Sequence, residues 1–143
     1  MDNLEFEQGL ASGLKIGLTG NLDTEIQEEL QPNKTLEPVR IICSANHYRD
    51  SRVHVHQPRN IATGFVVCGR RHHNCINTFT QIVSFPYSEQ ALTIKRTETQ
   101  GFLTNTNLFV DRKLALLIAL HAKQLIHSKY IDPNVGLTSE DIY

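Results

Sequence analysis

The residues best suited to chemistry form three groups along the chain. The first is the basic turn CGRRHHNC at residues 68–75, which follows the apolar run at residues 64–67. The second is the pair His54 and His56, and the third is the polar segment QGFLTNTNLFVDR at residues 100–112. Arginine forks onto phosphate oxygens, and imidazole supplies a hydrogen-bond donor or a metal ligand. Each group therefore has a binding interpretation and a purely structural one.

The basic turn favours an anion site. Arg70, Arg71 and His72 follow a strand-like run and a glycine, where a helix start would present free backbone N–H groups and a positive dipole end. The turn also contains two thiols and two imidazoles, which are ligand types for zinc. Because His72 and His73 are adjacent, they do not easily point into one tetrahedron. A solvated basic turn without a ligand is the remaining alternative.

His54 and His56 are separated by one residue, so on a strand both imidazoles would lie on one face. Such a pair can bind a metal or take part in phosphodiester chemistry. The sequence has no second pair of this kind and no obvious carboxylate partner for it. The structural alternative is that both histidines are exposed on a strand and have no function.

The segment at residues 100–112 combines a polar loop composition with two phenylalanines. Phenylalanine rings stack on nucleobases, and asparagine amides can pair with the edge of an adenine. The structural alternative is that both rings anchor the loop to the core, while Asn105 or Asn107 takes a left-handed turn conformation. The candidate ligand-binding residues are Arg49, Arg70, Arg71, His72, Phe102, Thr104, Asn105, Asn107, Phe109 and Arg112.

The pattern of apolar residues predicts an α+β fold with an antiparallel β-sheet. Residues 1–37 are expected to form a peripheral N-terminal arm, and residues 38–143 a single ligand-binding domain. The expected helices span residues 70–82 and 111–127, and Asp111 is expected to cap or open the second. The expected strands, from β-branched and alternating apolar runs, are residues 39–45, 64–69, 82–87, 91–97 and 99–104, with a hairpin over 47–56.

The helix expected at residues 111–127 is apolar nearly all round. Such a helix has to be covered on more than one side. In a chain of this size, a second copy is the natural source of the other surface, and symmetric homo-oligomers are common. The sequence therefore predicts that this helix packs on the sheet and also lies at a subunit interface.

The composition is that of an ordinary globular domain, with 40% hydrophobic and 20% charged residues and a formal charge of −1. The chain has no overall basic field of the kind that generic nucleic-acid binders use. Three cysteines without a CxxC spacing argue against a disulfide framework. No apolar run approaches the roughly 20 residues of a membrane span, and the acidic start is unlike a signal peptide. A cytoplasmic protein is expected.

Several ordered segments together resemble a family of small phage proteins, the Thoeris anti-defence 1 family. These segments are HQPRN, GFVVCGRRHHNC, QGFLTNTNLFVDRK and the closing SEDIY, and the resemblance covers roughly residues 39–143. Members of that family bind and sequester cyclic ADP-ribose isomers without cleaving them, which keeps the immune effector off. Some also hold cyclic di- or trinucleotides at a separate site, and they assemble as dimers that build up to hexamers.

The resemblance implies a homo-oligomeric sponge without a cofactor, acting in the cytoplasm of the infected bacterial host. The Phe/Asn segment and Arg112 would contact adenine and ribose, and the basic turn would contact the phosphates. No nucleophile elbow, P-loop or HExxH motif is found, so the sequence predicts a binder and not an enzyme. The alternative is a metal-dependent phosphodiesterase acting on a nucleotide signal through His54, His56 and the Arg70–Cys75 turn.

Overall fold

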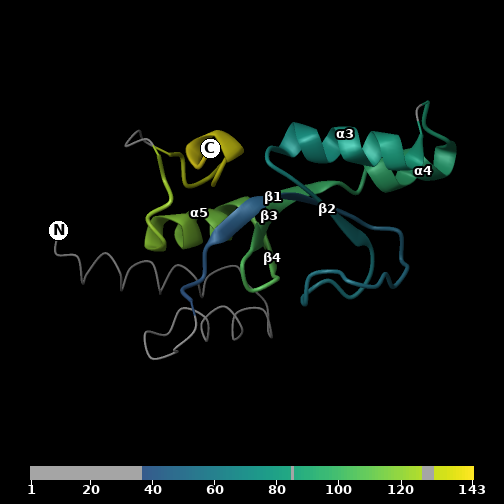
Figure 1. Cartoon of the computed structure of the whole chain (residues 1–143). Coiled ribbons are helices and arrows are strands. Elements are labelled where there is room, and N and C mark those ends of the chain that lie inside the picture. Colours follow the sequence, from purple (N-terminus) through teal and green to yellow (C-terminus); the bar gives the residue numbers. More distant parts are fainter. Residues whose placement is uncertain (1–36, 85, 127–130) are drawn as a thin grey trace.

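The computed structural model describes residues 37–84, 86–126 and 131–143. In these residues four strands form an antiparallel sheet in the order β2-β1-β3-β4, and helices pack on it (Figure 1). The predicted α+β class with an antiparallel sheet is therefore confirmed. The elements in chain order are β1 Ile41–Tyr48, β2 Phe65–Gly69, α3 His72–Val83, α4 Glu89–Lys95, β3 Thr99–Thr104, β4 Phe109–Asp111, α5 Arg112–His121 and the short 3-10 helix η1 Ser139–Asp141.

One face of the sheet carries both long helices. The register places Ser44 of β1 opposite Gly69 of β2 and Phe102 of β3, and Phe102 opposite Val110 of β4, so these residues share a face. At one end of this face, helix α3 packs on an aromatic cluster around Tyr48 and Phe79. At the other end, α5 packs on an aliphatic cluster that includes Phe102 and Val110. Figure 1 shows α3 with α4 at one side of the molecule and α5 with the C-terminal segment at the other.

Helix α5 is shorter than predicted and is covered by its own chain. Asp111 caps its first turn by accepting a hydrogen bond from Leu114 N at 2.8 Å, as the sequence predicted. The helix ends at His121 because Lys123 adopts a positive φ of 56°, and the amide of Gln124 bonds back to the carbonyl of Ala119 at 2.9 Å. The predicted extension to residue 127 is wrong, and residue 127 itself lies outside the described residues.

The segment after α5 folds back and covers the second side of the helix. Leu137 is fully buried in the aliphatic cluster, and Ile131 and Ile142 pack against it. The apolar surface that suggested a partner copy is thus covered within the chain. The homo-oligomer stays a prediction.

Three other predictions of local structure were wrong. Residues 91–97 lie mostly in helix α4, which begins after Ser88 and ends at Lys95, and not in a strand. Ile82 and Val83 end helix α3, and Phe85 lies outside the described residues. The hairpin expected over residues 47–56 is absent, because the chain leaves β1 at Tyr48 and forms a loop up to β2.

The loop at residues 49–64 crosses the other face of the sheet. The side chain of Asn60 meets the outer edge of β4, and that of Gln57 meets the outer edge of β2. Between them, the ring of His47 lies 3.1 Å from the carbonyl oxygen of Thr63. Within the described residues, no helix is both long and apolar enough to cross a membrane.

Candidate functional site

The basic turn that leads from β2 into helix α3 is tightly packed. A Cβ added at Gly69 would lie 3.0 Å from Cβ of Asn74 and 3.2 Å from the amide of Cys75. The amide of Arg71 donates to Oδ1 of Asn74 at 3.0 Å, which fixes the first helical turn. The strand, glycine and helix start predicted from the sequence are all present. Arg70 and Arg71 therefore precede the positive end of a helix of 12 residues.

His72 turns inward and is used by the fold. Its side chain is buried, its Nε2 lies 2.8 Å from the carbonyl oxygen of Gly101, and its ring meets Phe102 edge-on with centroids 5.0 Å apart. Burial and the nearby positive charge of Arg112 lower the pKa of His72. The ring is therefore neutral near pH 7 and donates from Nε2 to Gly101.

Arg112 reaches the same place from the start of α5. Its guanidinium donates to Oε1 of Gln100, and its Nη1 donates to the carbonyl oxygen of Leu137 at 3.3 Å. Arg112 directly follows Asp111, the register partner of Gly101, and the carbonyl oxygen of Gly101 bonds to the ring of His72. The structure thus brings the start of α5 near the start of α3.

The segment after Leu137 lies over the basic turn. Arg71 pairs with Glu140 at 3.1 Å and donates to the backbone oxygen of Tyr143 at 3.4 Å. The guanidinium of Arg70 lies 5.6 Å from the centre of the Tyr143 ring, a cation–π distance. The hydroxyl of Tyr143 donates to the carbonyl oxygen of Ile42 at 2.8 Å. We call Arg70, Arg71, Gln100 and Arg112, with the tail residues that contact them, the arginine junction.

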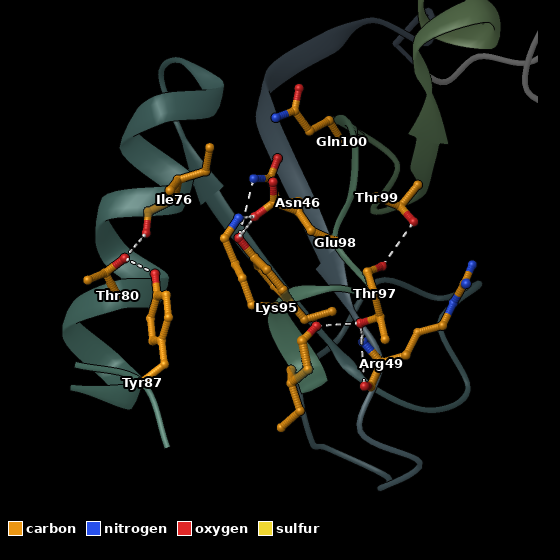
Figure 2. A network of polar contacts seen from close by, with 12 residues as sticks. Asn46, Arg49, Ile76, Thr80, Tyr87, Lys95, Thr97, Glu98, Thr99 and Gln100 are labelled. Atoms are coloured by element: carbon orange, nitrogen blue, oxygen red, sulfur yellow. Dashed lines mark hydrogen bonds and ion pairs between the residues drawn. The ribbon is translucent and has the colours of Figure 1, made fainter. Parts of the chain in front are cut away.

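A second polar group, which the sequence analysis missed, continues from this junction across the sheet (Figure 2). The Tyr48 hydroxyl donates to Glu98 at 2.6 Å, and Lys95 pairs with the same carboxylate. Asn46 is fully buried and donates to the Tyr48 hydroxyl at 3.4 Å. Burial and the Glu98 carboxylate raise the pKa of Tyr48, so its hydroxyl stays protonated.

Asn46 lies next to the arginine junction in the sheet. It is the register partner of Gln100 on the neighbouring strand, and Gln100 accepts from Arg112. Among the described residues, Oδ1 of Asn46 is the buried side-chain polar atom without a hydrogen-bond partner. The alternation of Ser44, Asn46 and Tyr48 within an apolar strand was the signal that could have revealed this polar line.

The predicted residues of the β3–β4 turn are occupied by local structure. Asn105 accepts from the amide of Arg40 at 2.9 Å and donates to the carbonyl oxygen of Pro38 at 3.1 Å. Thr104 is buried, and its hydroxyl accepts from the amide of Leu108 at 3.2 Å. Asn107 has a φ of 64°, the left-handed conformation that the structural alternative expected of Asn105 or Asn107.

Both phenylalanines of this segment belong to the core. Phe102 has no exposed surface, and Phe109 is 8% exposed with its ring 5.7 Å from that of His47. The Phe109 ring covers Gly101, where an added Cβ would lie 2.7 Å from Cζ of the ring. Neither ring presents a free face on which a nucleobase could stack in this structure.

Arg49 lies away from the other basic residues. It follows the end of β1, where its amide bonds to the hydroxyl of Thr97 at 2.8 Å, and its side chain is exposed (Figure 2). Gly69, where the basic turn begins, is the register partner of Ser44 in the middle of β1. The structure therefore places Arg49 beyond the end of β1 and apart from the basic turn.

The two histidines at 54 and 56 do not share a strand face. Residues 53–56 lie in the loop, His54 pairs with Asp50 at 2.7 Å, and His56 has a positive φ of 59°. The described residues contain no group of three or more histidine, cysteine or acidic side chains placed to hold a metal ion. The geometric premise for a metal site at these histidines is therefore wrong.

The three cysteines differ in environment. A hydrogen bond from the Cys43 thiol lowers the pKa of Cys68 to about 7, whereas burial raises the pKa of Cys75 to about 12. All three are free thiols. Cys68 is exposed on β2, so it is the thiol most available as a thiolate near pH 7.

The family model described as Phage T4 y16D protein matches residues 40–143. The chain therefore belongs to the phage T4 y16D protein family. No curated protein and no solved structure matches it.

Proposed function

We propose that this phage protein is an anti-defence sponge that sequesters a cyclic ADP-ribose isomer in the cytoplasm of the infected host and does not cleave it. The observation that carries the proposal is the arginine junction. Arg71, at the start of α3, pairs with the carboxylate of Glu140 and donates to the main-chain oxygen of Tyr143. Arg70 contacts the Tyr143 ring, and Arg112, at the start of α5, donates to Gln100 and to the carbonyl oxygen of Leu137, so the charges of both meet uncharged groups.

The partners of these arginines resemble what a nucleotide would offer. Arg71 binds a side-chain carboxylate oxygen and the main-chain oxygen of Tyr143, and Arg112 binds an amide oxygen and a carbonyl oxygen. The two phosphates of a cyclic ADP-ribose isomer supply anionic oxygens for which guanidinium is well suited. The Tyr143 ring beside Arg70 offers an aromatic surface close to the same charges. Phosphate oxygens would thus replace weaker tail contacts.

The proposed site keeps only part of the predicted residue set. Arg70, Arg71 and Arg112 remain, and Gln100 is added because it positions the Arg112 guanidinium. The phenylalanines and the residues of the β3–β4 turn are left out because they are part of the core or bond to the local backbone.

Sequestering a signal requires a dissociation constant well below the signal concentration, and nanomolar binding corresponds to about 12 kcal/mol. Such affinity needs a ligand that is largely enclosed.

The test is to incubate the full chain with a cyclic ADP-ribose isomer, remove free ligand, denature the protein and identify the released molecule by mass spectrometry. We expect release of the intact ligand in stoichiometric amount, and competition by cyclic di- or trinucleotides shows whether they share the site. Recovery of cleaved product would favour an enzyme. Absence of any retained nucleotide would remove the sponge proposal.

The matched variants are Arg112→Ala, Arg71→Ala and Arg49→Ala. The first two remove junction arginines, and the third removes an exposed arginine at the far end of β1. We expect ligand retention to fall at least tenfold in the first two and to stay unchanged in Arg49→Ala. Equal loss in all three would indicate non-specific charge attraction in place of a site. Size-exclusion chromatography with light scattering on each variant tests the proposed homo-oligomer in the same samples.

A further inference from the structure

The two edge strands of the sheet differ in how far the rest of the chain satisfies their outward backbone groups. At the β4 edge, Asn60 accepts from the amide of Phe109 at 2.9 Å and donates to its carbonyl oxygen at 2.7 Å. The amide of Arg59 bonds to the carbonyl oxygen of Asn107 at 2.8 Å, just before the strand. The loop thus acts on this edge as a neighbouring strand would, and the edge is closed.

The β2 edge is open over most of its length. The amide of Val66 points outward and donates to Oε1 of Gln57 at 2.8 Å. In an antiparallel sheet the outward groups recur every second residue, so the N–H and C=O of Cys68 and the C=O of Val66 point the same way. No hydrogen bond from another described residue reaches these three groups. Edge strands with free groups of this kind are templates for pairing with another chain.

A groove of about 490 Å³ runs beside this open edge. Helix α3 forms its other wall through Thr78 and Ile82, which are four residues apart and lie on one side of the helix. Ile82 is 62% exposed, although it is a large apolar residue. The complete lining, formed by β2, α3 and the loop before β2, is His54, Gln57, Phe65, Val66, Val67, Cys68, Thr78 and Ile82.

The lining indicates the chemistry of the occupant. It contains no lysine, arginine, aspartate or glutamate. Its titratable side chains are His54, which pairs with Asp50, and Cys68, which bonds to the Cys43 thiol and has a pKa lowered to about 7. Away from these two groups, a charged side chain would lose its hydration without gaining a partner. The backbone groups of β2 need donors and acceptors repeated at two-residue spacing. An extended polypeptide supplies that spacing.

We propose that the groove between β2 and α3 is a docking site for an extended, uncharged apolar segment of another protein, which adds to the sheet as a fifth strand beside β2. Its main chain pairs with Cys68 and with the carbonyl of Val66. Its side chains point alternately to the two faces of the sheet, so every second side chain enters the space between β2 and Ile82. Strand β2 has five residues, or roughly 17 Å, which sets the length of the segment that pairs. This mode of recognition uses backbone bonds for affinity and the pocket for selectivity.

The first experiment selects from a displayed library of random dodecapeptides on the full chain. We expect enriched peptides with an uncharged, alternating apolar pattern. Binding of a synthetic enriched peptide should fall at least tenfold in Ile82→Asp and stay unchanged in Val135→Asp, which alters an exposed apolar residue of the tail. Failure to enrich any such pattern, or equal loss in both variants, would overturn the proposal.

The second experiment leaves the protein unchanged and alters the peptide backbone. N-methylation of alternate residues removes the peptide N–H groups that face β2 in one variant and those that face solvent in the other. We expect loss of binding in only one of the two. Equal binding of both methylated peptides would show that no strand is added. Concentration-dependent dimers that disappear in Ile82→Asp would show that a second copy occupies the groove, and that result would also overturn the proposal.

Discussion

Strand β3 carries polar residues at both of its ends, and the two ends differ in what their side chains are free to do. At the Thr104 end, hydroxyl and amide groups bond to the backbone of the same turn and of the segment before β1. At the Gln100 end, arginines from two helix starts are held by a side-chain amide, a carboxylate, backbone oxygens and an aromatic ring. Both ends have the composition of a binding site, but only the second has charge that a ligand can recruit.

The difference shows that polar side chains which satisfy backbone N–H and C=O groups are not available to bind a ligand. Asn105 satisfies an amide and a carbonyl that have no strand partner there. Removing it would leave the partly buried amide of Arg40 without its partner, which destabilises the folded chain. Arg71 instead contacts Glu140, whose side chain is 62% exposed. Exposed ion pairs contribute little to stability, so a ligand can replace them at low cost.

The largest effect that separates the two ends is expected for Phe102→Ala. Phe102 is fully buried between β3, α5 and the ring of His72. Truncation should lower the free energy of unfolding by about 3–5 kcal/mol, as for other buried phenylalanines. Urea denaturation followed by circular dichroism measures this change. A loss below about 1 kcal/mol with complete loss of nucleotide binding would return Phe102 to the ligand site.

Asn105→Ala should have a smaller effect on the same quantity. The variant leaves the Arg40 amide and the Pro38 carbonyl without their side-chain partners, so we expect a loss of about 1–2 kcal/mol. Asn107→Gly is the matched control, because glycine tolerates its φ of 64° and the stability should change little. Nucleotide binding should be unchanged in both. Loss of binding in folded Asn105→Ala would contradict the structural role.

The sequence was informative where apolar pattern and capping agree. Strands β1, β2 and β3, helix α3 and the Asp111 cap were predicted from local runs. Helix α4 was missed because the run ALTIKRT contains β-branched residues, while the cap that starts the helix, Ser88, lies before it. Strand β4 was missed because it has only three residues, and its pairing with β3 depends on the turn that joins the two strands. The end of α5 was missed because Lys123, and not glycine, takes the left-handed position.

The site was predicted in part for a similar reason. The basic turn and Arg112 could be recognised by residue type, and the structure brings them together. The tail contacts of Glu140 and Tyr143 could not be predicted, because they join residues about 70 positions apart through the fold of the C-terminal segment. The burial of Phe102 depends on the long-range pairing of β3 with β1. Local composition carries no information about that pairing.

The stability of the Gln100 end should depend on pH through His72. Burial lowers its pKa in the folded state below the ordinary 6.5, although the hydrogen bond to Gly101 acts against burial. The charge of Arg112 acts in the same direction as burial, and Glu140 and Glu98 act against it. The unfolded chain therefore takes up a proton first as pH falls. The stability contributed by neutral His72 is complete above about pH 7 and is lost as pH falls below 6.5 towards the folded pKa.

His72→Gln separates this contribution from that of other groups. Glutamine can still donate to the Gly101 carbonyl, but it does not titrate. The pKa of His47 is also lowered by burial, so His47→Gln serves as the comparison. Urea unfolding at pH 7.5 and pH 5.5 should show a smaller loss of stability on acidification in His72→Gln than in the unaltered protein. An unchanged loss would mean that His72 titrates normally and is not held neutral.

The smallest effect on stability is expected for Glu140→Gln, which should also gain affinity for the ligand. Hydrogen bonding to its own backbone amide, together with Arg71, holds the pKa of Glu140 below its usual range, so the carboxylate is charged at pH 7. Since the side chain is largely exposed, its removal should change the free energy of unfolding by less than about 1 kcal/mol. The freed Arg71 should bind a cyclic ADP-ribose isomer about two- to fivefold more tightly. Isothermal titration at two salt concentrations measures this gain, which should shrink at high salt.

The matched control for this prediction is Glu37→Gln, which breaks the exposed ion pair between Glu37 and Arg40 at 2.8 Å. That pair lies beside Asn105, at the Thr104 end of β3. Glu37→Gln therefore removes one negative charge, as Glu140→Gln does, but at the opposite end of the strand. If the tail competes with the ligand for Arg71, only Glu140→Gln should gain affinity. Equal gains in both variants would show that net charge alone governs binding. A loss in Glu140→Gln would show that the tail carboxylate holds Arg71 in the position that the ligand needs.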